Sequence, residues 1–315
     1  MNPPHHRKWL KANRNSIKMK YIKSPLNYAG GKYKLLDSLF EIFPKNINTF
    51  VDLFAGGFNV GINVSAKTII CNDQISYLID LYKFLKLTPT EEVIEQIKNR
   101  IDEFQLTKQN AEGYNLLRDR YNMNKNIVDF FVLTFYAFNH QIRFNNSQKF
   151  NTPFGKDRSS YNDSIEKNLV LFCEALKNKN INFYNNDFLS VDLNSLGKND
   201  LVYCDPPYLI STGSYNDGKR GFKDWTELEE YQLLNLLDDL NNRGVKFALS
   251  NVLYHKGLSN ELLIEWSKKY TVYYLDKSYS NCSYHFKERD AKTVEVVITN
   301  FESEDYAQCQ QISLF

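Results

Sequence analysis

Long hydrophobic runs are missing from this sequence. No apolar stretch of the 315-residue chain approaches the roughly 20 residues that a membrane-spanning helix needs. No apolar segment follows the basic N-terminus, so a secretory signal peptide is not expected either. With 43% hydrophobic and 24% charged residues, the composition is ordinary for a soluble globular protein. We therefore expect a cytoplasmic protein of one or two domains.

Cysteine pairs with metal-binding or disulfide-forming spacing are also missing. The chain has five cysteines, and no two of them have Cys-x-x-Cys spacing. They are Cys71, Cys173, Cys204, Cys282 and Cys309. An odd number of scattered cysteines indicates neither a disulfide framework nor a zinc site. We expect small core residues or free thiols at these positions, and no metal cofactor.

A strong net charge is the third absence. Lys and Arg number 39 against 37 Asp and Glu, a net charge of +2. Residues 1–20 carry six of the basic residues and no acid, so the rest of the chain is slightly acidic. This basic segment is either an arm that lies on DNA phosphates or an unstructured leader, and we favour the leader. Overall charge therefore gives no sign of a nucleic-acid partner.

Four apolar, β-branched runs each contain or end at an acid. They cover residues 48–54, 67–73, 181–187 and 200–205. The acids are Asp52, Asp73, Asp187 and Asp205. Runs of this length and composition predict buried strands, and the first meets a glycine turn at Gly56 and Gly57.

Helices alternate with these strands. Residues 77–85 and 226–242 have helical periodicity, and a cap-like pattern of Thr226 and Glu229 opens the second segment. Residues 247–251 and 293–299 predict two further strands. The alternation predicts an α/β fold with a parallel sheet covered by helices on both faces. Because ligands of such sheets bind beyond the carboxyl ends of the strands, we expect the four acids to share one crevice.

One segment interrupts the alternation. Residues 91–104, 114–121 and 127–138 have helical patterns, and a polar, turn-rich stretch follows at 139–156. We interpret residues 88–165 as an inserted helical domain that ends in a hairpin. The sheet domain is then discontinuous and comprises residues 21–87 and 166–302, between a leader (1–20) and a C-terminal tail (303–315).

The tetrapeptide Asp205-Pro206-Pro207-Tyr208 follows a predicted strand and carries the clearest chemistry. An amine on a heteroaromatic ring is a poor nucleophile because its lone pair is delocalised. Its N–H groups can bond to the Asp205 carboxylate and the Pro206 carbonyl, which turns the lone pair toward an incoming methyl group. Tyr208 can stack on the ring, so that catalysis rests on positioning and electrostatics. The structural alternative is a rigid turn after a strand.

These motifs together resemble the Dam-like adenine-N6 DNA methyltransferases (D12 class, alpha group). Residues 25–32 are similar to that family's first motif, residues 50–57 to its glycine loop, and residues 72–73 to its ribose-binding acid. Residues 205–208 resemble its catalytic tetrapeptide, and the similarity covers about residues 25–301. The resemblance implies a Rossmann-like sheet that binds S-adenosylmethionine, an inserted target-recognition domain, and methylation of N6 of an adenine flipped out of duplex DNA.

The resemblance also implies a set of cofactor-binding residues. They are Tyr28, Lys32, Asp52, Phe54, Gly56, Gly57, Asp73, Asp187, Phe188 and Asp205. The glycines allow the backbone to turn beside the cofactor, and Asp73 can bond the ribose hydroxyls or cap the next helix. Two positions depart from the family. Tyr28 stands where relatives often have Trp, and Phe58-Asn59 replaces a third glycine, which leaves the path of the loop open.

In the insertion, the resemblance implies a DNA-reading surface. Its residues are Phe138, Asn139, Gln141, Arg143, Lys149, Pro153, Lys156 and Arg158. Arg143 and Pro153 have the spacing of the family's target-reading hairpin, and Arg can bond guanine O6 and N7. The lysines and Arg158 suit phosphates, and a charged surface hairpin is the structural alternative. We expect the enzyme to recognise a short GATC-like DNA sequence. An asymmetric sequence containing GA is the alternative, because Gln141 stands where Dam has an apolar residue and a glutamine could read an adenine.

Two rival functions remain at this point. Asp-Pro-Pro-Tyr suits any conjugated amine, so a cytosine-N4, RNA-adenine or protein-glutamine methyltransferase is one rival. A DNA-binding module that keeps the fold without catalysis is the other. We favour an adenine-specific DNA methyltransferase that is bacterial or phage-encoded and acts as a monomer on double-stranded DNA. We expect either a restriction-modification system, in which a cognate restriction endonuclease acts independently, or an orphan methylase.

Overall fold

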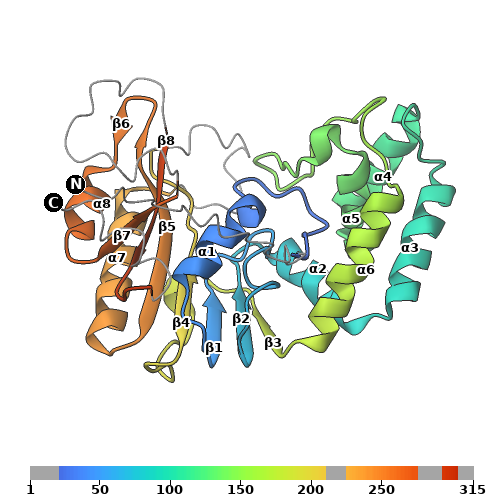
Figure 1. The fold of residues 1–315 in the computed structure, drawn as a ribbon. Helices are drawn as coiled ribbons and strands as arrows, with labels where there is room; N and C mark the ends of the chain where they lie inside the picture. The colour runs from blue at the N-terminus through green and yellow to red at the C-terminus, as the bar shows by residue number, and fades with distance from the viewer. Residues whose placement is uncertain (1–20, 211–224, 276–292, 304–315) are drawn as a thin grey trace, which may run out of the picture.

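The computed structural model describes residues 21–210, 225–275 and 293–303. The predicted leader and the tail beyond Ser303 lie outside the described residues. An eight-stranded sheet forms the centre, in the order β3-β2-β1-β4-β5-β8-β7 with β6 beside β5 (Figure 1). Its strands are β1 (Thr49–Asp52), β2 (Thr68–Asn72), β3 (Ile181–Tyr184), β4 (Leu201–Cys204), β5 (Lys246–His255), β6 (Leu258–Ser259), β7 (Thr271–Tyr274) and β8 (Thr293–Thr299).

Strands β1 to β5 run parallel, while β8 pairs antiparallel with both β5 and β7. The chain leaves β1 for β2 and β3 on one side, and later enters β4 and β5 on the other. A crevice opens at such a switch point, beyond the carboxyl ends of the central strands. Asp52 ends β1 opposite Tyr203 of β4, so Asp205 follows close by. The α/β fold expected from the sequence is confirmed, but the sheet is only partly parallel, because β6, β7 and β8 pair antiparallel.

Both faces of the sheet are covered, as the apolar strands require. Successive side chains alternate between two apolar clusters: Phe50 joins one cluster and Val51 the other. The first cluster includes residues of α1 (Leu36–Ile42), α2 (Ser76–Leu87) and α6 (Asp163–Asn178). The second includes residues of α7 (Glu227–Asn242) and α8 (Glu261–Ser267). The capping box of Thr226 and Glu229 begins α7, as its sequence predicts.

The segment between β2 and β3 is helical. It contains α3 (Thr90–Glu103), α4 (Ala111–Asn124) and α5 (Ile127–Tyr136), which lie with α6 beyond the β3 edge of the sheet (Figure 1). The side chains of Asn126 and Asn162 cap the N-termini of α5 and α6. In the described ranges, no helix has the length and hydropathy to cross a bilayer.

The loop after α5 is held by isolated contacts. Two single antiparallel bridges close it, Ala137 with Phe154 and Phe144 with Phe150. The chain turns back inside the inner bridge, where the Asn145 N–H donates to the Lys149 carbonyl at 2.8 Å. The described residues also contain three short 3-10 helices. They are η1 (Lys32–Leu35) before α1, η2 (Phe138–His140) after α5 and η3 (Phe188–Ser190) after β3.

Candidate active site

The glycine loop after β1 folds against Tyr28. Gly56 has φ +46°, and a Cβ added there would lie 2.9 Å from Tyr28 Cε1. A Cβ on Gly57 would lie 3.1 Å from Tyr28 Cβ. The glycines are therefore needed because the tyrosine occupies the space that side chains would take.

Phe58 stands where the family has a third glycine, and its conformation shows the path of the loop. It adopts a left-handed backbone with φ 56°, and its fully buried ring packs against Tyr82 and Phe183. A Cβ on Gly61 would lie 2.2 Å from Phe58 Cε2, so this later glycine makes room for the ring. The burial of an aromatic ring offsets the strain of a conformation that non-glycine residues rarely adopt.

Two buried acids, Asp52 and Asp73, lie at the carboxyl ends of β1 and β2. Asp73 accepts bonds from the Gly56 N–H at 2.8 Å and the Ile75 N–H at 2.9 Å, and thereby ties the glycine loop to the start of α2. Burial raises the pKa of Asp73 to about 6. Asp52 accepts a bond from the Gly61 N–H at 3.0 Å, and burial raises its pKa to about 8. Carboxylates desolvated in this way favour a cation beside them.

The Asp205 carboxylate contacts two donors. Lys32 Nζ lies 2.8 Å from Asp205 Oδ1, and the Tyr208 hydroxyl donates to the same oxygen at 2.9 Å. Lys32 is only 5% exposed, its Nζ lies 5.2 Å from the centre of the Tyr208 ring, and it also donates to the Gly30 carbonyl at 3.1 Å. The structure therefore brings Lys32 of the first motif to the tetrapeptide, where its side chain is buried rather than solvated.

Glu295 on β8 is a member of this cluster that we did not expect from the sequence. Its Oε1 accepts a bond from the Tyr208 hydroxyl at 3.2 Å and lies 3.5 Å from Lys32 Nζ. The one available signal was a lone acid within the apolar strand TVEVVIT. Because Val294 and Val296 pack in the second apolar cluster, the alternation of β8 turns Glu295 toward the other face, where Lys32 lies.

Three aromatic rings adjoin the crevice. Phe54, Phe188 and Trp225 have ring centres 5.4 to 5.7 Å apart, and the Trp225 indole donates to buried Glu230 at 2.6 Å. Trp225 was also missed in the sequence, since it follows no strand motif. Asp187 caps η3 by accepting from the Leu189 N–H at 3.0 Å.

These residues fit S-adenosylmethionine. That molecule carries a sulfonium and an ammonium, two ribose hydroxyls and an adenine. The buried carboxylates of Asp52 and Asp73 suit its positive charges and hydroxyls, and the loop at Gly56 allows close approach of the backbone. Among the described residues, no group of three or more His, Cys, Asp or Glu side chains is placed to hold a metal ion.

Arg143 is held within the loop after α5. Its Nε donates to Asn151 Oδ1 and its Nη2 to the Asn151 carbonyl, both at 2.9 Å. The Asn151 N–H in turn donates to the Arg143 carbonyl at 2.9 Å. These bonds use one edge of the planar guanidinium and leave its end-on N–H pair facing away from Asn151.

The other predicted DNA contacts lie on the same loop. Gln141, Lys149, Pro153, Lys156 and Arg158 are all exposed. The Phe138 ring is 39% exposed, and the Arg158 guanidinium lies 5.9 Å from its centre. Asn139 has φ 52°, and its carbonyl accepts a bond from Asn27 Nδ2 at 2.8 Å. Asn27, which the sequence did not single out, thereby links this loop to the first motif.

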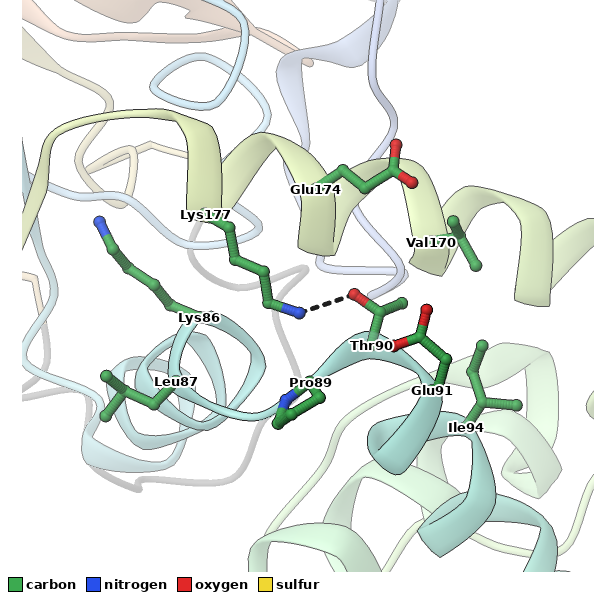
Figure 2. Close-up of a pocket in the computed structure, with 9 residues that line it drawn as sticks. All are labelled: Lys86, Leu87, Pro89, Thr90, Glu91, Ile94, Val170, Glu174 and Lys177. Carbon is green, nitrogen blue, oxygen red and sulfur yellow. Dashed lines mark hydrogen bonds between the residues drawn. The ribbon is translucent and has the colours of Figure 1, made fainter.

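A separate hollow of about 530 Å³ lies between α6 and the α2–α3 turn (Figure 2). In it Lys177 donates to the Thr90 hydroxyl at 2.6 Å, and the side chains of Pro89, Ile94 and Val170 contribute apolar surface. It contains none of the residues predicted from the motifs, and its mixture of charges indicates no particular ligand.

The sheet order, the glycine loop and the acids at the carboxyl ends define a methyltransferase fold of the type that uses S-adenosylmethionine. The chain belongs to the family of D12 class N6 adenine-specific DNA methyltransferases, whose sequence profile matches residues 28–281. The resemblance inferred from the motifs is thereby confirmed.

Named relatives agree with this membership. The chain is 54% identical over 281 residues to type II methyltransferase M.FokI of Planomicrobium okeanokoites, which covers 89% of this chain and 43% of that protein. It is 48% identical over 295 residues to modification methylase StsI of Streptococcus sanguinis, covering 93% and 45%. The DNA adenine methylase of Escherichia coli strain K12 is 30% identical over 241 residues, covering 74% and 82%. The chain thus spans less than half the length of the first two relatives.

Proposed function

We propose that this protein transfers a methyl group from S-adenosylmethionine to N6 of adenine in double-stranded DNA. The observation that carries the proposal is the placement of Asp205 and Tyr208 at the carboxyl end of β4, beside the buried acids Asp52 and Asp73. Membership in an adenine-N6 DNA methyltransferase family supports both N6 of adenine as the methyl acceptor and DNA as the substrate.

The chain's own residues position the amine. One N–H of the target donates to the Asp205 carboxylate and the other to the Pro206 carbonyl, while the Tyr208 ring stacks on the base. S-adenosylmethionine supplies an electrophilic methyl group on a sulfonium. As the N6 lone pair forms the new N–C bond, the C–S bond breaks and its electrons stay on sulfur. The methylated nitrogen is then cationic and loses a proton to water, so no general base is required.

We propose that the loop after α5, the reading loop, recognises the base sequence of the DNA target site. The end-on N–H pair of Arg143 suits guanine O6 and N7, while Lys149, Lys156 and Arg158 suit phosphates. Phe138 and Asn139 match positions that the family uses near the base pair that the target leaves, and base flipping would give Asp205 access to N6. We propose a short site containing GA, GATC-like or asymmetric.

The family, together with relatives named as a type II methyltransferase and a modification methylase, supports a role in restriction and modification. We propose that the protein acts as a monomer in the cytoplasm of a bacterium or a phage-infected cell. A restriction endonuclease that cuts the same site independently would be its partner system.

Replacement of Asp205 tests the proposed function. Asp205→Ala removes the acceptor for the target amine, so methyl transfer to duplex DNA should fall by about a hundredfold or more. Asp239→Ala is the matched control, because Asp239 is an exposed acid of α7 whose surface ion pair contributes little. Turnover of the purified Asp205→Ala protein near the wild-type level would show that the catalytic assignment is wrong.

A further inference from the structure

Lys32 and Tyr208 each lie between the same two carboxylates. Lys32 Nζ is 2.8 Å from Asp205 Oδ1 and 3.5 Å from Glu295 Oε1. The Tyr208 hydroxyl is 2.9 Å from the first oxygen and 3.2 Å from the second. A hydroxyl has one proton, so Tyr208 donates fully to only one of the two carboxylates at a time. The cluster therefore has an alternative arrangement that requires almost no movement.

The target amine competes for one of these acceptors. In the proposed reaction the N6 amine donates to the Asp205 carboxylate, whose Oδ1 already accepts from Lys32 and Tyr208. Lys32 is 5% exposed and Tyr208 9%, so water is poorly placed to replace a lost acceptor. Burial also raises the pKa of Tyr208, which keeps its hydroxyl a donor. Weakening the bond of a buried hydroxyl or ammonium group to a carboxylate carries a free-energy cost.

We propose that Glu295 is a positioning residue that accepts Lys32 and the Tyr208 hydroxyl when the target amine takes Asp205. The inference rests on the proposed function and deepens it. Glu295 releases Asp205 for the amine, and it also neutralises Lys32, so that the negative charge of Asp205 remains available to the nitrogen that becomes cationic. Glu295 itself touches neither the base nor the transferred methyl group.

The charge balance leads to a specific test. Lys32, Asp205 and Glu295 together carry one net negative charge. Glu295→Gln keeps the size and an oxygen acceptor but leaves the cluster neutral, with Lys32 paired to Asp205. The rate of a single turnover at saturating cofactor and DNA should fall by about tenfold to a hundredfold, while the dissociation constant for DNA stays the same. Glu302→Gln, a change of an exposed acid just after β8, should leave the rate unchanged.

Removing Lys32 as well separates this role from a merely structural one. In Lys32→Met/Glu295→Gln the cluster again carries one negative charge, on Asp205. The substitution at Glu295 should therefore cost much less in the Lys32→Met background than in the wild-type background. An equal loss in both backgrounds, or a Glu295→Gln rate within about twofold of wild type, would overturn the proposal.

A binding measurement gives a readout that does not depend on turnover. S-adenosylmethionine is cationic at sulfur and S-adenosylhomocysteine is neutral there. Glu295→Gln should lower the preference for the cation over the neutral product about threefold or more, because the cluster around Asp205 loses its net negative charge. An unchanged preference would contradict the charge role. If the Glu295 variants fail these tests while wild type is active and Asp205→Ala is inactive, only the role of Glu295 is overturned and the proposed function stands. An inactive wild-type protein would overturn both proposals.

Discussion

At the scale of single residues, Asp52 and Asp73 make the site sensitive to pH. Burial raises their pKa values to about 8 and about 6, above the value of about 4 that an unfolded chain gives an aspartate. The folded protein therefore binds more protons than the unfolded chain between these values. Its stability without ligand should fall as the pH rises from about 4 to 8, because the carboxyls must then ionise while buried.

Melting temperatures and cofactor affinity check this expectation together. The ligand-free protein should melt several degrees lower at pH 8 than at pH 6. S-adenosylmethionine should bind more tightly at pH 8, where about half of the Asp52 carboxyls are ionised and attract its positive charge. Asp52→Asn should flatten both dependences and weaken cofactor binding. Stability that rises between pH 6 and 8 would contradict the assignment of buried, protonated carboxyls.

Arg143 and Lys149 should behave differently when replaced. Arg143→Ala removes the proposed bidentate base contact, which would discriminate against a wrong base by about 1–3 kcal/mol, and should relax the choice at one guanine. Lys149→Ala removes a phosphate contact and should weaken binding to all sequences and reduce its salt dependence. Methylation rates on sites with each substituted base pair measure both. Unchanged discrimination in Arg143→Ala would remove this residue from the reading surface.

Prediction of site residues is possible from the sequence where a motif is local. The tetrapeptide and the glycine loop are each contiguous, so their chemistry can be recognised in a line of sequence. Glu295 contacts Tyr208 across a separation of 87 residues, and no local pattern shows that distance. Trp225 and Asn27 were missed for the same reason, since each meets its partner only after the sheet and the insertion have folded.

At the scale of elements, the strands were predictable and some helices were not. The apolar runs that end at acids form β1 to β4 almost as expected. Two-sided burial of β1, β2 and β4 requires continuous apolar sequence, whereas β3 lies at the edge of the sheet and is partly exposed, so the burial expected for it was wrong. Helix α6 was missed: it lies at the end of the insertion, where we expected a domain boundary. The predicted hairpin is a loop with two isolated bridges, because buried rings of Phe144 and Phe150 hold it in place of a ladder.

The insertion contains a charged cluster that should stabilise its helices. Asp129 of α5 is 1% exposed and pairs with Arg100 of α3 at 2.6 Å and with Arg120 of α4 at 2.8 Å. Asp129→Ala should lower the free energy of unfolding by about 2–4 kcal/mol, somewhat less than for a fully buried pair because both guanidinium groups are partly exposed. Glu103→Ala, which removes a half-exposed acid of the same cluster, should cost less than about 1 kcal/mol. Chemical denaturation measures both, and equal losses would contradict this account.

At the scale of the whole molecule, one apolar cluster runs from the sheet into the inserted helices. Phe50 of β1 and Phe131 of α5 belong to it, as does Phe150 of the reading loop. The domain boundaries expected after residues 87 and 165 remain a prediction. Sequence periodicity shows where helices lie, but it does not show which helices pack in the same hydrophobic core. Packing of this kind would hold the reading loop at a fixed distance from Asp205, as methylation at one position within a site requires.

The most direct measurement of the central claim is sequencing of DNA from cells that express the 315-residue chain, with modified bases read in their sequence context. The account predicts N6-methyladenine at one short motif in which a guanine adjoins the methylated adenine, and its loss from cells that express Asp205→Ala. Unmodified adenines with the wild-type chain present, methylation of another base, or modified adenines without an adjoining guanine would contradict it.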